Sequence, residues 1–179
     1  MRILYSVMLV MSLLVISLTA FAGPISDTFS DSVFGLKWTD DIETVKIKIP
    51  GRKVDDKYGI LMYTVRDGRE VLKMKRTDKD KITFVFDSTR KLNGVSIEFP
   101  YDGSESWGEL LNKTTTYFGA HDTNTASGYG LNIVWPRDNN ITLTLSLIPK
   151  MKVLGFDYDM LMNIGRVVSV EASKTELGF

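Results

Sequence analysis

The residue types best suited to catalysis or metal binding are scarce in this sequence. It has one histidine, His121, and no cysteine. The missing cysteines exclude thiol catalysis, thiolate metal sites and disulfides. His121 could in principle serve a Ser-His-Asp arrangement, but no Gly-x-Ser-x-Gly turn accompanies it. It follows an expected helix stop at Gly119, and we interpret it as a solvated loop residue.

Carboxylates are the remaining candidates for chemistry. Asp157 and Asp159 flank a tyrosine, and Asp78 and Asp80 flank a lysine. Neither pair continues into the spacing of a calcium-binding loop. Paired acids could hydrolyse glycosides, but only at a separation that a sequence does not define. We therefore predict a protein that is not an enzyme and that has no catalytic residue, metal or cofactor.

A dense run of charge covers residues 66–81, RDGREVLKMKRTDKDK. Such a run could contact anionic lipid or nucleic acid, but its interleaved acids weaken the positive field. We favour a solvated sheet edge that resists further strand pairing, and we expect no nucleic-acid partner. Arg69, Lys73 and Lys75 are candidates for contact with a partner protein.

The first 22 residues have the features of a cleaved signal peptide. Arg2 precedes an apolar run, and Ala20-Phe21-Ala22 has the small-x-small pattern of a cleavage site. An uncleaved membrane anchor is the alternative, because the run approaches the length that spans a bilayer. We expect cleavage before Gly23, a flexible lead over residues 23–35 and one domain over residues 36–179. The protein would then be periplasmic or, alternatively, extracellular, without a stable membrane anchor.

The sequence from 40 to 81 predicts a helix followed by a hairpin. Residues 40–49 have acids in a first turn that Thr39 could cap, and Pro50-Gly51 would stop the helix, although VKIKI also alternates like a strand. We favour the helix. Strands at 58–65 and 70–76 would be joined through Asp67-Gly68, a common hairpin turn.

Residues 82–99 are the clearest hairpin. Ile82, Phe84 and Phe86 alternate with polar residues, and the alternation resumes after the turn, with a bulge expected near Asn93-Gly94. The apolar face should be buried. The opposite face carries Thr83, Ser96 and Glu98, which are the remaining candidates for partner contact.

The second half of the sequence predicts a helix, two strands and a terminal helix. Residues 104–119 carry an apolar stripe and the capping-box spacing of Ser106 and Glu109. Strands follow at 129–135 and 141–149, and a helix at 157–174. The fold class is therefore α+β, with an antiparallel sheet of about six strands and one well-defined helix on one face. A tandem helix-then-hairpin arrangement is compatible with this order.

One set of residues resembles known families. Gly35-Leu36-x-Trp38 precedes the short helix, and Phe86-Asp87 precedes Leu92 and Val95. This pattern, over about 34–99, resembles small bacterial envelope modules, namely outer-membrane assembly proteins of the SmpA/OmlA type and the β-lactamase-inhibitor-protein fold. The resemblance implies a non-catalytic binding module. The assembly proteins are lipid-anchored through a cysteine, which this sequence lacks.

Two functions follow as expectations. The first is an exported accessory module that contacts another envelope protein, with an inhibitor or immunity role as one version. The second is a carrier of a small molecule or lipid, with a pocket between the sheet and helix 104–119. The sequence leaves the oligomeric state and the partner's identity open.

Overall fold

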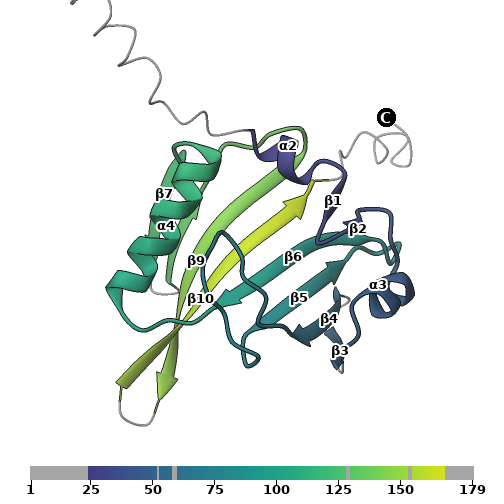
Figure 1. The fold of residues 1–179 in the computed structure, drawn as a ribbon, viewed down its shortest axis with the longest axis horizontal. Coiled ribbons are helices and arrows are strands. Elements are labelled where there is room, and N and C mark those ends of the chain that lie inside the picture. The colour runs from purple at the N-terminus through teal and green to yellow at the C-terminus, as the bar shows by residue number, and fades with distance from the viewer. Residues whose placement is uncertain (1–23, 52, 58–59, 128–129, 153–154, 168–179) are drawn as a thin grey trace, which may run out of the picture.

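The protein is an α+β fold built on one large antiparallel sheet (Figure 1). The computed structural model describes residues 24–51, 53–57, 60–127, 130–152 and 155–167, and the expected signal peptide lies outside them. The sheet has eight strands in the order β3-β4-β5-β6-β10-β9-β8-β7, and β1 and β2 form a separate small pair. The elements are α2 (Ile25–Phe29), β1 (Ser32–Val33), β2 (Leu36–Lys37), α3 (Ile42–Lys48), β3 (Lys53–Lys57), β4 (Ile60–Arg66), β5 (Lys81–Phe86), β6 (Leu92–Phe99), α4 (Ser104–Phe118), β7 (Thr123–Ser127), β8 (Gly130–Val134), β9 (Ile141–Lys152) and β10 (Gly155–Arg166).

The sheet has eight strands instead of about six because three were not predicted as strands, whereas the predicted strand at 70–76 does not belong to the sheet. The two edge strands, β3 and β7, have the sequences KVDDK and TNTAS, which lack an apolar alternation. The third is β10, where we expected a helix from residue 157. Within the described residues that prediction is wrong, and residues 168–174 lie outside them. Met160, Met162 and Ile164 are buried on one face of β10 while the residues between them are not, which is the period of a strand.

The predicted hairpin between 58–65 and 70–76 is also wrong. β4 pairs with β3 on one side and with β5 on the other, and residues 67–80 form a long connection between β4 and β5. Within that connection only Val71 and Met74 form an isolated bridge. Asp67-Gly68 therefore begins this long connection instead of closing a hairpin. The 82–99 hairpin is confirmed as β5 and β6, with Asn93 as the extra residue of a bulge opposite Val85 and Phe86.

The helix predicted within residues 40–49 is confirmed as α3, but its cap differs from the prediction. Asp41, not Thr39, is the N-cap, and its carboxylate accepts a hydrogen bond of 2.9 Å from the Thr44 amide. Hydrogen bonding within this cap lowers the pKa of Asp41. Ile42 and Val45 bury the inner face of α3 in the core.

The predicted long helix is confirmed as α4, with two corrections. Its N-cap is Gly103, and the Ser106 hydroxyl donates to the Gly103 carbonyl instead of forming the expected capping box. The apolar stripe is only partly buried, since Leu110 and Thr114 are fully buried whereas Tyr117 is 40% exposed. Gly119 ends the helix at φ 83°, a conformation that favours glycine.

Residues 25–35 belong to the folded domain, although we expected a flexible lead there. They include α2 and β1, and Ile25 and Val33 are each only 3% exposed. The Ser26 amide donates to Asp138 over 2.9 Å, which ties α2 to the turn before β9.

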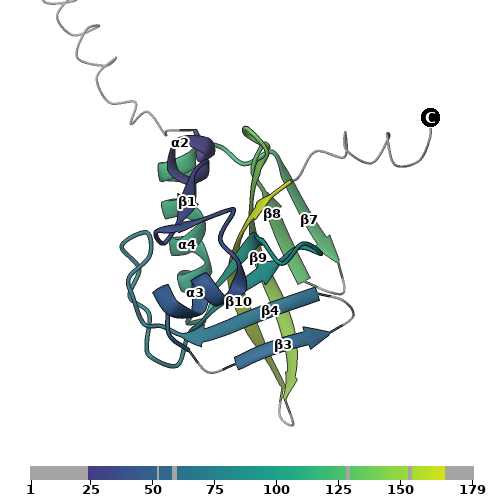
Figure 2. The ribbon, with the colours of Figure 1, turned by 90° about the vertical axis from the view of Figure 1, so that its right-hand side faces the viewer.

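The three helices of the described residues, α2, α3 and α4, lie on one side of the sheet (Figure 2). The core is formed between them and the inward side chains of the strands, including the fully buried Phe84 and Leu143. The order of elements repeats, since α3 precedes β3–β6 and α4 precedes β7–β10. The two series meet in the middle of the sheet, where β6 pairs with β10.

Candidate functional site

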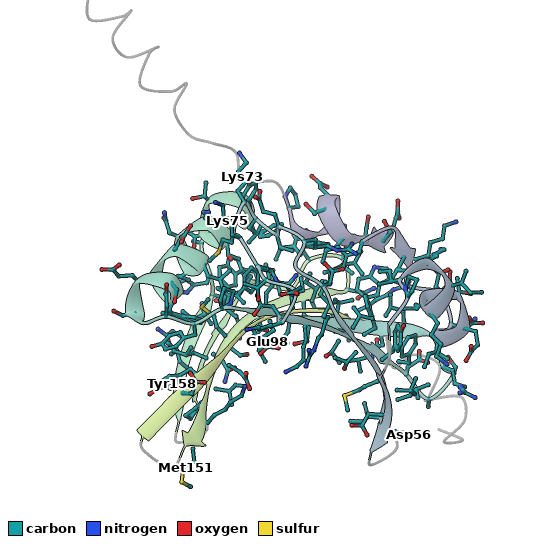
Figure 3. All side chains as sticks on the ribbon, turned by 60° about the horizontal axis from the view of Figure 1, so that its bottom comes forward. Asp56, Lys73, Lys75, Glu98, Met151 and Tyr158 are labelled. Carbon is teal, nitrogen blue, oxygen red and sulfur yellow. The ribbon has the colours of Figure 1, made fainter. Side chains whose placement is uncertain are left out.

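The face of the sheet opposite the helices is the candidate site, and we call it the open face. Figure 3 shows this face as a hollow, with the sheet bending down toward Asp56 at one rim and toward Tyr158 and Met151 at the other. The second rim is a two-stranded arm, because β9 and β10 continue beyond their pairing with β8 and β6. Met151 in that arm is 89% exposed.

A band of hydroxyl and amide side chains crosses the middle of the open face. Thr64 and Thr83 are joined over 3.0 Å, and the Ser96 hydroxyl donates to the Asn163 carbonyl oxygen over 2.8 Å. The Asn163 amide donates to Ser146 over 3.1 Å, and Ser146 donates to Asn132 over 2.7 Å. These bonds involve six adjacent strands: one joins β4 to β5, and the others join β6 through β10 and β9 to β8. They hold the polar side chains in fixed positions.

Charged residues lie to one side of this band. Lys81 forms an ion pair with Glu98 at 3.3 Å, and Lys150 pairs with Asp159. Burial disfavours the charged form of Lys150, but the bond to Asp159 and the nearby charges of Glu98 and Asp157 outweigh it and raise the pKa of the lysine. Both lysines therefore pair with a carboxylate, and this part of the open face carries both signs of charge.

To the other side of the band, the side chains are small. In this row Val85, Gly94, Gly165 and Thr142 face one another on four adjacent strands. A depression of about 220 Å³ lies over this row and reaches Ser96 and Asn163. A second depression of about 300 Å³ lies over Lys81, Glu98 and Leu161 on the charged side. The open face therefore has two depressions that could accommodate protruding side chains of a partner.

The candidate contact residues fall on two different sides of the molecule. Thr83, Ser96 and Glu98 lie together on the open face and line the second depression. Arg69, Lys73 and Lys75 belong to the 67–80 connection, and Figure 3 places Lys73 and Lys75 on the helix side, away from Glu98.

Arg69 is also engaged within the domain. It pairs with Asp67, and its guanidinium lies 5.0 Å from the centre of the Phe34 ring. One partner could not cover both sets through a single flat contact.

Sequence reasoning missed Asn163 and Asn132 on the open face. Asn163 was hidden by the helix prediction for β10, and Asn132 lies in a strand whose alternation is weak. The alternation in ITLTLSL places Thr142, Thr144 and Ser146 on one face, and that signal could have extended the candidate list.

His121 is not a freely solvated loop residue. Its ring meets the Trp135 ring edge-on at 5.8 Å, and it is half-buried. The Trp135 indole donates to the Gly119 carbonyl over 2.8 Å, which fixes the end of α4 near this contact. We assign His121 a packing role.

The described residues offer neither a metal-binding cluster nor a membrane-spanning helix. Those residues contain no group of three or more histidines and carboxylates placed to hold a metal ion. No helix among them is long and apolar enough to cross a membrane.

The comparisons with known proteins add no relative. No protein-family model, curated protein or solved structure matches the chain significantly.

Proposed function

We propose that this protein is an exported, non-catalytic binding module that contacts another envelope protein through the open face of its sheet. The observation that carries the proposal is the hollow face, on which none of the described helices lies, with its band of hydrogen-bonded polar side chains. An antiparallel sheet with one buried and one solvated face leaves the second face free to bind. Its hydroxyls, amides, ion pairs and apolar patches match the mixed composition of protein interfaces.

The relief of the face also favours a protein partner. Depressions of about 220 and 300 Å³ adjoin each other across the polar band. Ordered polar side chains lose little conformational freedom on binding, which lowers the entropic cost of association. Thr83, Ser96 and Glu98 are the predicted contact residues that this proposal retains.

The carrier function is the second candidate, and the packing of α4 argues against it. Leu110 and Thr114 face the sheet and are fully buried, and Trp107, Leu111 and Phe118 pack against the same core. The sheet–helix space is therefore filled by side chains where these residues lie. A ligand there would have to displace core side chains, which are normally close-packed.

The export part of the proposal rests on residues 1–22, with periplasmic location preferred over release. The Arg2 start, apolar run and Ala20-Phe21-Ala22 pattern are those of a cleaved leader. Intact-mass measurement of the exported protein should give Gly23 as the first residue. A retained leader would contradict this part alone.

Affinity capture from envelope extract tests the binding proposal. The wild-type protein should retain one stoichiometric partner protein, and Thr83→Arg should lose it because a long cation would fill the polar band. The matched control is Thr116→Arg, since Thr116 is exposed on α4 at the opposite face. Equal capture by both variants, or recovery of a small molecule without protein, would overturn the proposal.

A further inference from the structure

The depression over the paired glycines has a floor without side chains. Gly94 on β6 lies directly opposite Gly165 on β10, in the two central strands of the sheet. Val85 and Thr142 flank the pair from the next strands, and Ser96 and Asn163 close one end. The bare backbone of two adjacent strands is thus accessible from the hollow side.

The fold does not require glycine at position 94. A glycine is needed where φ is positive or where a Cβ atom would clash, and neither holds here. A Cβ on Gly94 would lie 3.6 Å from its nearest neighbours, the Ile164 carbonyl oxygen and the Val85 Cβ, which is ordinary contact. Gly165 has a local reason, since its Cβ would lie 2.9 Å from the Thr142 hydroxyl oxygen. Glycine weakens a strand interior and often marks a bulge, such as the one at the adjacent Asn93, or a place where another molecule approaches closely.

In designed sheets, aromatic side chains are placed beside edge glycines to stabilise them, and a ring could cover a central pair in the same way. The cross-strand neighbours that flank this pair, Val85 and Thr142, are not aromatic, and neither are Ser96 and Asn163 at its end. The depression of about 220 Å³ exceeds the roughly 150 Å³ cavity that holds a benzene ring in an engineered protein core. Glycine backbone forms its floor, and Val85 and Thr142 line it on either side, which leaves room for the face of a ring.

We propose that the Gly94–Gly165 depression is an anchor site for one tryptophan or tyrosine side chain of the protein that binds the open face. This inference rests on the proposed function and names the chemistry of the partner's central contact. Tryptophan and tyrosine combine a large apolar ring with a hydrogen-bonding edge and dominate interface hot spots.

The end of the depression supplies partners for such an edge. Ser96 and Asn163 lie there with hydrogen-bonding side chains. Asn93 also lines the depression, and its side-chain oxygen is buried without a hydrogen-bond partner. A ring that carries an N–H or O–H group could donate to this oxygen after a rotation of the Asn93 amide.

Amide NMR of the exported chain, titrated with N-acetyl-tryptophanamide up to its solubility limit, tests the site. The expected result is a set of saturable shifts confined to Gly94, Gly165 and Thr142, with at least tenfold smaller response to N-acetyl-leucinamide. Gly94→Val should abolish the shifts at Gly165 and Thr142 by filling the depression. Gly94→Ala, which adds one methyl group in open contact distance, should weaken them and keeps the test valid if the valine variant does not fold.

Gly108→Ala is the matched control, because a Cβ there meets nothing within 4 Å on the far side of the molecule. It should bind the probe as the wild type does. Absence of localised shifts, equal response to both probes, or unchanged binding by Gly94→Ala and Gly94→Val would overturn the anchor site. That result would leave the Thr83-dependent capture of a partner standing, so the two proposals fail separately.

Discussion

Asp87 organises the turn between β5 and β6 through one carboxylate oxygen. That oxygen accepts bonds from the Thr89 amide at 2.8 Å, the Thr89 hydroxyl at 2.7 Å and the Lys91 amide at 3.0 Å. Partial burial raises the pKa of Asp87, but these bonds to the charged form outweigh it, and the pKa is lowered from 3.8. The carboxylate must therefore be ionised for the turn to have its full stability.

The folded pKa of Asp87 lies below its unfolded value, which sets the direction of the pH effect. Its contribution to the free energy of unfolding is fully present above about pH 4 and is lost as pH falls through the folded pKa. Urea unfolding at pH 7 and pH 3 should show a smaller acid-induced loss in Asp87→Asn than in the wild type. An identical loss in both proteins would show that Asp87 does not contribute.

The α4 stripe can be tested at single residues. Leu110 is fully buried, and Leu110→Ala should lower the free energy of unfolding by about 2–5 kcal/mol. Asn112 is exposed on the same helix, and Asn112→Ala should change it by less than about 0.5 kcal/mol. Chemical denaturation measures both, and small, equal effects would contradict the packing of α4 on the sheet.

Sequence reasoning found part of the open face at the residue level. Alternation in β5 and β6 placed Thr83, Ser96 and Glu98 on one face, because large apolar residues occupy the alternate positions of those strands and mark the opposite face as buried. The same reasoning could not connect Ser96 to Asn163, 67 residues away. That contact depends on which strands become neighbours, and no local pattern encodes it.

At the scale of elements, the 67–80 connection is held by a buried arginine. Arg76 is 7% exposed and donates to the carbonyls of Glu98 at 2.7 Å, Lys81 at 2.9 Å and Arg69 at 3.3 Å. Its guanidinium also lies 5.7 Å from the centre of the Phe99 ring. Burial lowers the pKa of Arg76, although an arginine remains charged. The connection is thus fastened to β5 and β6.

Removal of the guanidinium should detach this connection. Arg76→Met leaves backbone acceptors without their charged donor and should lower the free energy of unfolding by roughly 3 kcal/mol or more. Lys75→Met is the control, since Lys75 is exposed, and its effect should stay within about 0.5 kcal/mol. Thermal and urea denaturation measure the stability of both variants, and equal stabilities would refute the anchoring role of Arg76.

Helices and strands whose own sequence carries a cap, an apolar stripe or an alternation were predicted. Strands whose conformation depends on pairing with neighbouring strands were not. α3, α4 and the β5–β6 hairpin have caps, stripes or alternation of their own. β10 contains DYDMLMNIG, in which apolar residues fit either period, and its pairing with β6 and β9 selects the strand. β3 and β7 have weak strand propensity, and pairing on one side decides their conformation.

At the scale of the whole molecule, the two helix-and-strand series should unfold together. The sheet is continuous across β6 and β10, and one core cluster includes Trp38 from the first series and Trp135 from the second. Variants that retain only Trp38 or only Trp135 should show fluorescence and circular-dichroism transitions at the same urea concentration. A fluorescence transition that precedes the loss of secondary structure in either variant would indicate independently unfolding halves.

The central claim is that the open face, and not the helix side, contacts the partner. Photocrosslinking measures this most directly, with benzoylphenylalanine placed at Thr144 on the open face or at Thr116 on α4 and each protein mixed with envelope extract. We expect one discrete crosslinked protein from position 144 and none from position 116. A crosslink from position 116 alone would place the contact on the helix side, and binding through the open face would then be wrong.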